Sequence, residues 1–292
     1  MAAAAPPGFI DSHHHLWDYS EAAYPWMGPQ HGPIKRSFLP ADLAPQLAAA
    51  GFARTVVVQA RQSLEETAWL LAQADAHAWI AGVVGWVDLR AEPAELAAQL
   101  ARFAAHPKLV GVRHVVHDEP DDAFMDGAAF RRGIGELQAH GLAYDLLLFP
   151  RHLRRAAALA AAFPSQRFVL DHIGKPATAR GAAPPADWLA DLRALAACPN
   201  VHVKLSGLVT EFAPWGAWAR ADFAPVLAAV VGAFGAARCM IGSDWPVSLL
   251  AASDYAACQS IVIEWCRANL SAEEAEGVLG ANCAKFYRLA AA

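Results

Sequence analysis

The amino-acid sequence predicts an α/β protein, a single (β/α)8 TIM-like barrel with long loops after several of its strands. Three observations point to this fold. The chain of 292 residues has room for one large barrel. Eight short apolar runs alternate with Ala- and Leu-rich amphipathic stretches, which is the pattern of repeated strand–helix units. The runs are nearly continuously apolar, as expected for parallel strands that are covered on both faces.

The expected strands occur in order along the chain, and amphipathic stretches such as "LEETAWLLAQADAH" and "FRRGIGELQAHG" separate them. The last such stretch opens with a capping box, because Ser271 precedes Glu274 by three residues. An open doubly wound sheet is the alternative, but no GxGxxG turn follows the first run. No break in composition divides the chain, so one domain is expected over residues 1–292. The eight runs are 8–15, 53–61, 80–89, 108–116, 142–149, 166–174, 200–207 and 238–247.

Three connections are long and rich in Pro, Gly or Trp. They cover residues 18–40, 175–188 and 208–223, after the first, sixth and seventh predicted strands. Each one follows a strand, so all three belong to the C-terminal rim of the barrel. Enzymes with this fold build their active sites at that rim.

The composition indicates which partners and which locations are not expected for this chain. Hydrophobic residues make up 56% and charged residues 17%, which suits a large buried core. The formal net charge is −5 and no basic run occurs, so a nucleic-acid partner is not expected. The apolar runs are too short for a membrane span. The five cysteines form no CxxC pair and the first residues lack the pattern of a secretion signal, so a reducing, cytoplasmic location is expected.

The first predicted strand carries three consecutive histidines. Alternation along a strand puts His13 and His15 on one face, with Asp11 below them, and His14 on the other face toward the helices. If the first two face the barrel axis, their imidazoles can hold one divalent metal. A pair of hydrogen-bonded structural histidines is the alternative. The surrounding strand pattern disfavours a remnant of an affinity tag.

Two further strand ends carry candidate catalytic side chains. Asp244 ends the eighth run, and closure of the barrel brings it next to the first strand. It can ligate a metal or act as general base, with a helix N-cap as the alternative. His172 ends the sixth run, where a packed core histidine is the alternative. Its neighbour Asp171 is expected to face outward by alternation.

Polar and aromatic side chains also end the second to fifth runs. Alternation puts Arg113 on the face opposite His114. Each of these residues alone is more often a packing residue than a substrate contact, but together they form a ring with few cations. Few cations suit a neutral or small polar substrate better than a polyanion. With one residue from the first long loop, the predicted substrate contacts are Trp26, Gln59, Arg61, Trp86, His114 and Tyr144, with Asp145 as the alternative on the fifth strand.

The segments "DSHHHLWD", "VVQAR", "GWVDL", "GVRH", "LDHIGKP", "KLSGL" and "GSDWPV" together resemble the lactonase branch of the amidohydrolase superfamily. The similarity is greatest to hydrolases of sugar lactones such as L-fucono- and L-rhamnono-lactone, and weaker to 2-pyrone-4,6-dicarboxylate lactonase. It runs over nearly the whole chain in the right order. The resemblance implies a TIM-like barrel that opens lactone rings with water, and it matches the family's site positions to His13, His15, His172 and Asp244.

The same resemblance indicates how many metal ions to expect. No lysine or glutamate ends the fourth strand and no histidine ends the fifth, so a bridged pair of metals is not expected. At most one divalent ion such as zinc is expected, on His13, His15 and Asp244. Some lactonases that resemble this chain work without any metal, so a metal-dependent and a metal-free reaction both stay open.

The resulting hypothesis is a hydrolase of carboxylic esters that opens an aldono-lactone, with L-fucono-lactone as the expected substrate. Asp244 deprotonates the attacking water, and either a metal or the imidazoles of His13, His15 and His172 stabilise the oxyanion. A metal-dependent decarboxylase of the same superfamily and a non-catalytic sugar-binding barrel are the alternatives. The expected partner is a small-molecule lactone, and aromatic residues in the long loops are compatible with a homodimer.

Overall fold

The computed structural model describes residues 8–177, 179, 181–212, 215–252 and 254–291. The start of the chain, on which the expectation about a secretion signal rests, lies outside these residues. All eight predicted strands form, and neighbours in the sequence pair in parallel in the order β1 to β8, which confirms the (β/α)8 barrel. The strands are β1 (Phe9–His14), β2 (Phe52–Val58), β3 (Ile80–Gly85), β4 (Leu109–His114), β5 (Ala143–Leu146), β6 (Phe168–Leu170), β7 (Val201–Leu205) and β8 (Cys239–Ile241).

The two ends of the sheet meet beside the histidine cluster. The His15 amide donates to the Trp245 carbonyl at 2.7 Å, and the Asp244 amide donates to the His13 carbonyl at 2.8 Å. These bonds continue β1 and β8 past their last paired residues. The backbones that carry His13, His15 and Asp244 are therefore fixed to one another by main-chain hydrogen bonds.

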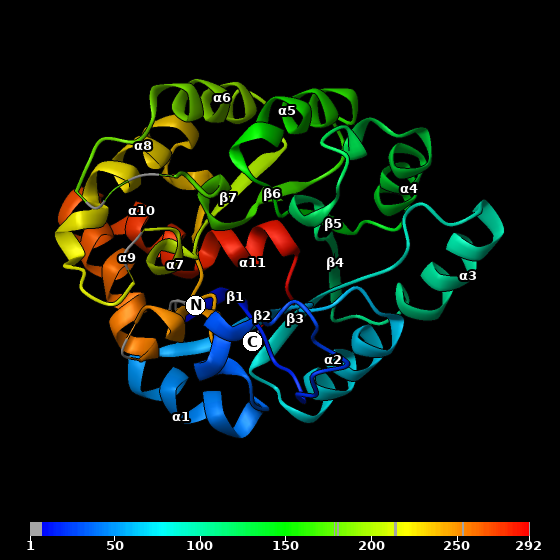
Figure 1. The fold of residues 1–292 in the computed structure, drawn as a ribbon, viewed down its shortest axis with the longest axis horizontal. Coiled ribbons are helices and arrows are strands. Elements are labelled where there is room, and N and C mark those ends of the chain that lie inside the picture. The colour runs from blue at the N-terminus through cyan, green and yellow to red at the C-terminus, as the bar shows by residue number, and fades with distance from the viewer. Residues whose placement is uncertain (1–7, 178, 180, 213–214, 253, 292) are drawn as a thin grey trace, which may run out of the picture.

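Helices surround the ring of strands, as Figure 1 shows. The predicted capping box is present at α10, where the Ser271 hydroxyl accepts from the Glu274 amide. The helices are α1 (Pro40–Ala50), α2 (Leu64–Ala76), α3 (Pro93–Phe103), α4 (Ala128–Ala139), α5 (Leu153–Ala162), α6 (Ala186–Ala196), α7 (Leu208–Glu211), α8 (Ala224–Phe234), α9 (Tyr255–Asn269), α10 (Ala272–Glu276) and α11 (Asn282–Tyr287).

The last helix, α11, lies across the middle of the ring of strands in Figure 1. Its Phe286 and Tyr287 pack against inward side chains of the barrel such as Ile10 and Val169. Asn282 donates to the Cys239 carbonyl at 2.8 Å, at the start of β8. The helix therefore closes the N-terminal end of the barrel and leaves the C-terminal end for a site.

The structure also bears on compartment and membrane association. The five cysteines carry free thiols, and four of them are buried. Within the described ranges, no helix has both the length and the apolar character that a membrane span requires.

Candidate active site

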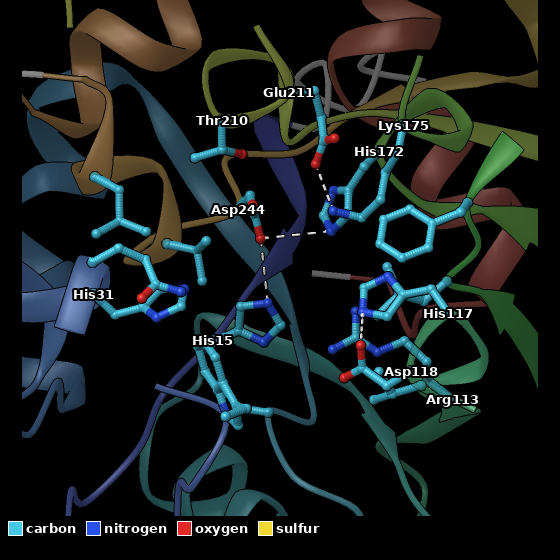
Figure 2. Close-up of a pocket in the computed structure, with 18 of the residues that line it drawn as sticks. His15, His31, Arg113, His117, Asp118, His172, Lys175, Thr210, Glu211 and Asp244 are labelled. Atoms are coloured by element: carbon cyan, nitrogen blue, oxygen red, sulfur yellow. Dashed lines mark hydrogen bonds and ion pairs between the residues drawn. The ribbon is translucent and has the colours of Figure 1, made fainter. Parts of the chain in front are cut away.

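A cavity of about 490 Å³ opens at the C-terminal ends of the strands. Ends of β1, β4 and β6 contribute to its wall, and so do the loops after β1, β6 and β7 that the sequence predicted at this rim. Figure 2 shows the side chains converging on it. The charged and aromatic residues among the lining are His15, Trp26, His31, Arg113, His117, Asp118, Phe149, His172, Lys175, Glu211, Trp215 and Asp244.

The histidines of β1 face as predicted, with one correction. The Nε2 atoms of His13 and His15 lie 3.3 Å apart inside the barrel, whereas His14 faces the helices and meets the Thr55 hydroxyl at 2.8 Å. The prediction that Asp11 lies below the first pair is wrong. Its carboxylate accepts from the Ser243 hydroxyl at 2.6 Å and from Tyr255 of α9 at 3.0 Å. The pairing register of β1 shifts between Asp11 and His14, so alternation does not hold across this segment.

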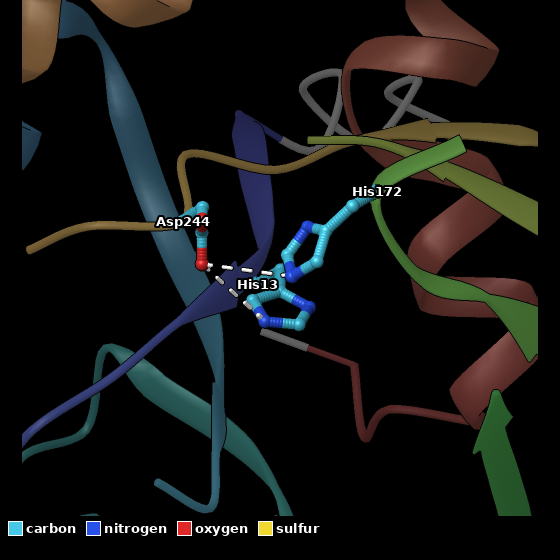
Figure 3. Close-up of side chains that lie close together, drawn as sticks. All are labelled: His13, His172 and Asp244. Carbon is cyan, nitrogen blue, oxygen red and sulfur yellow. Dashed lines mark ion pairs between the residues drawn. The ribbon is translucent and has the colours of Figure 1, made fainter. Parts of the chain in front are cut away.

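Asp244 lies at the centre of the histidine cluster. Its Oδ1 atom is 3.3 Å from His15 Nε2, 3.7 Å from His172 Nε2 and 3.8 Å from His13 Nε2. Figure 3 shows His13, His172 and Asp244 pointing toward one another. Asp244 and His172 both have left-handed backbones, with φ of 55° and 50°. Such conformations are costly for residues other than glycine and occur often at functional sites.

Gly207 gives the His172 ring the space it occupies. A Cβ atom at this position would lie 2.7 Å from Cγ of His172, and the φ of Gly207 is 67°. The same ring is held from below, since its Nδ1 lies 2.9 Å from the Ser206 hydroxyl. The turn after β7 therefore sets the position of a side chain that the turn after β6 supplies.

A layer of buried charges lies beneath the cluster. Asp171 contacts Lys204 at 3.1 Å, Arg113 at 3.0 Å and Nδ1 of His13 at 3.3 Å. Lys204 also pairs with Asp145 at 2.5 Å. The prediction that Asp171 faces outward is wrong, because its face of β6 is that of the inward Val169. His172 reaches the cavity because the backbone turns left-handed directly after the strand.

Burial and charge fix the protonation states of the cluster. Burial holds the pKa of His13 and of His172 well below the ordinary value, although Asp171 and Asp244 respectively oppose the shift. For Asp244, burial acts to raise the pKa, but His172 and His15 outweigh it and the net shift is downward. The site therefore presents neutral His13 and His172 and an ionised carboxylate near neutral pH.

The predicted substrate contacts divide into two groups. Trp26 lines the cavity, and it also lines an adjoining hollow of about 450 Å³ that includes Arg61. Gln59 is fully buried and donates to the Arg113 carbonyl at 3.2 Å, so it supports the cavity wall from behind.

The other three predicted contacts do not line the cavity. Tyr144 packs between Phe130 and Phe168 on the helix side of β5. The Trp86 indole donates to His114 at 3.3 Å, and His114 in turn meets Glu119 at 2.6 Å. His114 and Tyr144 lie on the outer face of β4 and β5, where Arg113 and Asp145 are the inward residues, buried against Asp171 and Lys204, and Trp86 follows β3.

A family model described as amidohydrolase matches residues 10–289 of the chain. The chain belongs to the amidohydrolase family. An L-fucono-1,5-lactonase of Burkholderia multivorans is 46% identical over 288 residues, 96% of each chain. A second L-fucono-1,5-lactonase, from Burkholderia ambifaria, is 40% identical and covers 96% of this chain and 95% of its own. A crystal structure of a Burkholderia multivorans amidohydrolase with bound zinc is 44% identical, superposes with a TM-score of 0.91, and covers 97% of this chain and 99% of that one.

The donor set of this amidohydrolase fits a divalent metal. Ligand atoms of His13, His172 and Asp244 all lie within 4.8 Å of one another. Nδ1 of His15 lies 2.8 Å from the Val58 carbonyl, which only accepts, so it carries the ring proton. Nε2 of His15 faces the Asp244 carboxylate at 3.3 Å. Imidazole with carboxylate is a common zinc donor set.

Several residues in and beneath the cavity of this amidohydrolase were not predicted from the sequence. Lys175 and Glu211 line the wall as an ion pair of 2.5 Å. Lys204 had a usable signal: a lysine between Val203 and Leu205, inside a strand covered on both faces, requires a buried carboxylate partner. His117 and Asp118 follow β4 in a short turn for which the sequence has no comparable signal.

Proposed function

We propose that this amidohydrolase opens a sugar lactone with water, with L-fucono-1,5-lactone as the expected substrate. The observation that carries the proposal is the ionised Asp244 facing His15 and His172 in the cavity at the C-terminal ends of the strands. The names and high identity of the two Burkholderia lactonases support the same reaction. The cavity volume of about 490 Å³ suits a molecule of the size of a sugar lactone.

In the proposed reaction, Asp244 accepts a proton from the attacking water and later returns it to the ring oxygen as the ester bond breaks. The lowered pKa of Asp244 keeps the carboxylate ready to accept that proton at neutral pH. His172, neutral and held by Ser206, orients the carboxylate from the opposite side. Trp26 provides an aromatic wall for the sugar ring.

We further propose that one divalent ion, such as zinc, binds to His13, His172 and Asp244, with His15 beside them. A bound zinc ion supplies a Lewis acid for the lactone carbonyl and lowers the pKa of water. The donor atoms of His13, His172 and Asp244, which lie within 4.8 Å of one another, and the zinc in the related amidohydrolase support this assignment. Whether the reaction needs the ion is decided by chelation.

A pH-indicator assay of purified protein against a set of aldono-lactones tests the function. Proton release from L-fucono-1,5-lactone, with slower release from unrelated lactones, is the expected result. Running the assay with and without a chelator, and restoring zinc afterwards, separates a required ion from a dispensable one. Release of carbon dioxide from an aromatic acid would instead support a decarboxylase. No turnover of any lactone contradicts the proposal and favours a non-catalytic barrel.

The five free thiols support a reducing compartment, and we propose the cytoplasm. Trp215, 42% exposed at the cavity rim, and Leu39, 38% exposed, are apolar side chains that a second copy could cover. Homodimer formation stays a prediction, which light scattering of the purified protein tests.

A further inference from the structure

The backbone after β6 makes an unusual turn. His172, Ile173, Gly174 and Lys175 have φ values of 50°, 52°, 73° and 50°, so four consecutive residues are left-handed and three of them are not glycine. The Lys175 amide closes the turn on the His172 carbonyl at 2.9 Å. Each non-glycine residue in this region costs roughly 1–2 kcal/mol. Strained backbone of this kind is concentrated at functional sites, so we ask which side chains the turn directs into the cavity.

The turn directs His172 and Lys175 into the same cavity, beside Glu211, as Figure 2 shows. Lys175 Nζ lies 2.5 Å from Glu211 Oε1, and both side chains are mostly buried, with exposed fractions of 15% and 16%. Burial raises the pKa of Glu211, while Lys175 acts to lower it. Glu211 belongs to the short helix α7, which follows β7, and it contacts Lys175 from there.

Lys175 and Arg113 are the two cationic side chains that line the described part of the cavity wall. Arg113 is occupied on the barrel side: one terminal nitrogen contacts Asp171 at 3.0 Å and His13 at 3.3 Å, and the other donates to the Gln59 carbonyl. The Lys175 ammonium has three protons, and among the described residues it donates one to Glu211. Lys175 therefore has protons left to donate to a ligand.

We propose that Lys175 is a further catalytic residue, whose ammonium contacts the carbonyl oxygen of the lactone as it becomes an oxyanion and then the carboxylate of the product. The inference rests on the proposed lactone hydrolysis. A bond forms between the water oxygen and the carbonyl carbon, and the water proton passes to Asp244. The bond between that carbon and the ring oxygen then breaks, and the ring oxygen takes the proton. Lys175 exchanges no proton; its positive charge stabilises the negative charge that develops on the carbonyl oxygen.

The test compares Lys175→Met, Lys175→Arg and Glu211→Gln with wild type, using L-fucono-1,5-lactone as substrate and free L-fuconate as ligand. Lys285→Met is the control, because Lys285 is exposed on α11 at the opposite end of the barrel. Lys175→Met is expected to lower kcat about 10²- to 10³-fold and to weaken fuconate binding about tenfold, while zinc content and melting temperature stay at wild-type values. Lys175→Arg keeps the positive charge, and its kcat is expected to be at least about tenfold higher than that of Lys175→Met. Glu211→Gln keeps the cation but weakens the contact that holds it in place. Its kcat is expected to fall less than that of Lys175→Met.

Kinetics and fuconate binding within about twofold of wild type in Lys175→Met overturn the proposal. A loss that comes with released zinc or a lower melting temperature also overturns it, because it indicates that the ion pair with Glu211 only holds the loop. These outcomes are distinct from failure of the proposed function, in which wild type itself opens no lactone.

Discussion

Oδ1 of Asp171 lies 3.3 Å from Nδ1 of His13, on the side of the ring away from Asp244. The contact belongs to the buried layer in which Lys204 reaches the same nitrogen at 3.1 Å. A carboxylate at the second nitrogen of a metal-binding histidine orients the ring and increases its basicity. Asp171 thus links the charged interior of the barrel to the cluster at its rim.

Asp171→Asn is expected to weaken zinc binding by about 10- to 100-fold, because His13 loses the carboxylate that orients it. The variant is also expected to unfold more easily, since Lys204 and Arg113 stay buried with one carboxylate fewer. Competition with a fluorescent chelator measures the affinity. Asp75→Asn, which breaks an exposed ion pair with His106, serves as control and should bind zinc like wild type. Wild-type affinity in Asp171→Asn would contradict the orienting role.

Zinc affinity is expected to change little with pH on the acid side of neutrality. Protons compete with a metal for imidazole nitrogen, and the lowered pKa values of His13 and His172 move this competition to lower pH. Two imidazoles with the ordinary pKa of about 6.5 would lose roughly a hundredfold in affinity between pH 7.5 and 5.5. We expect a loss of less than about tenfold in a titration series over this range. A hundredfold loss would show that the burial does not lower these pKa values.

Gly207→Ala is expected to reduce kcat/KM at least about tenfold, because the new methyl group would lie 2.7 Å from the His172 ring and push it from its position. The left-handed φ of 67° adds a loss of roughly 1–2 kcal/mol in unfolding free energy. Gly232→Ala is the matched control, since its Cβ would meet nothing within 4 Å and it lies inside α8. That variant should keep wild-type activity and gain stability. Full activity in Gly207→Ala would mean that His172 tolerates displacement.

The strand–helix repeat was enough to predict the barrel, because the apolar pattern directly reflects strands that are buried on both faces. The same alternation correctly predicted that His13 and His15 lie on one face of the strand and His14 on the face toward the helices. It failed at Asp11, where the register of β1 shifts, and at Asp171, which faces inward just before the backbone of His172 turns left-handed. Neither event has a signature in a single sequence.

The inner charge layer was missed for another reason. Arg113, Asp145 and Lys204 are each compatible with either face of a strand, and only their mutual pairing with Asp171 decides the inward one. The polar wall residues Lys175 and Glu211 come from different loops, which meet only when the barrel is closed. Residues of this kind become predictable once the inward face of one charged neighbour is known.

The most direct test of the account is the rate at which Asp244→Asn opens L-fucono-1,5-lactone under zinc-saturating conditions. Asparagine keeps the shape of the side chain but cannot accept the proton of the attacking water. A general base typically contributes 10²- to 10⁴-fold to a rate, so we predict that kcat falls about a thousandfold. Zinc content, measured on the same sample, shows whether lost metal contributes to the fall. An Asp244→Asn variant that opens the lactone within about twofold of the wild-type rate would contradict the account.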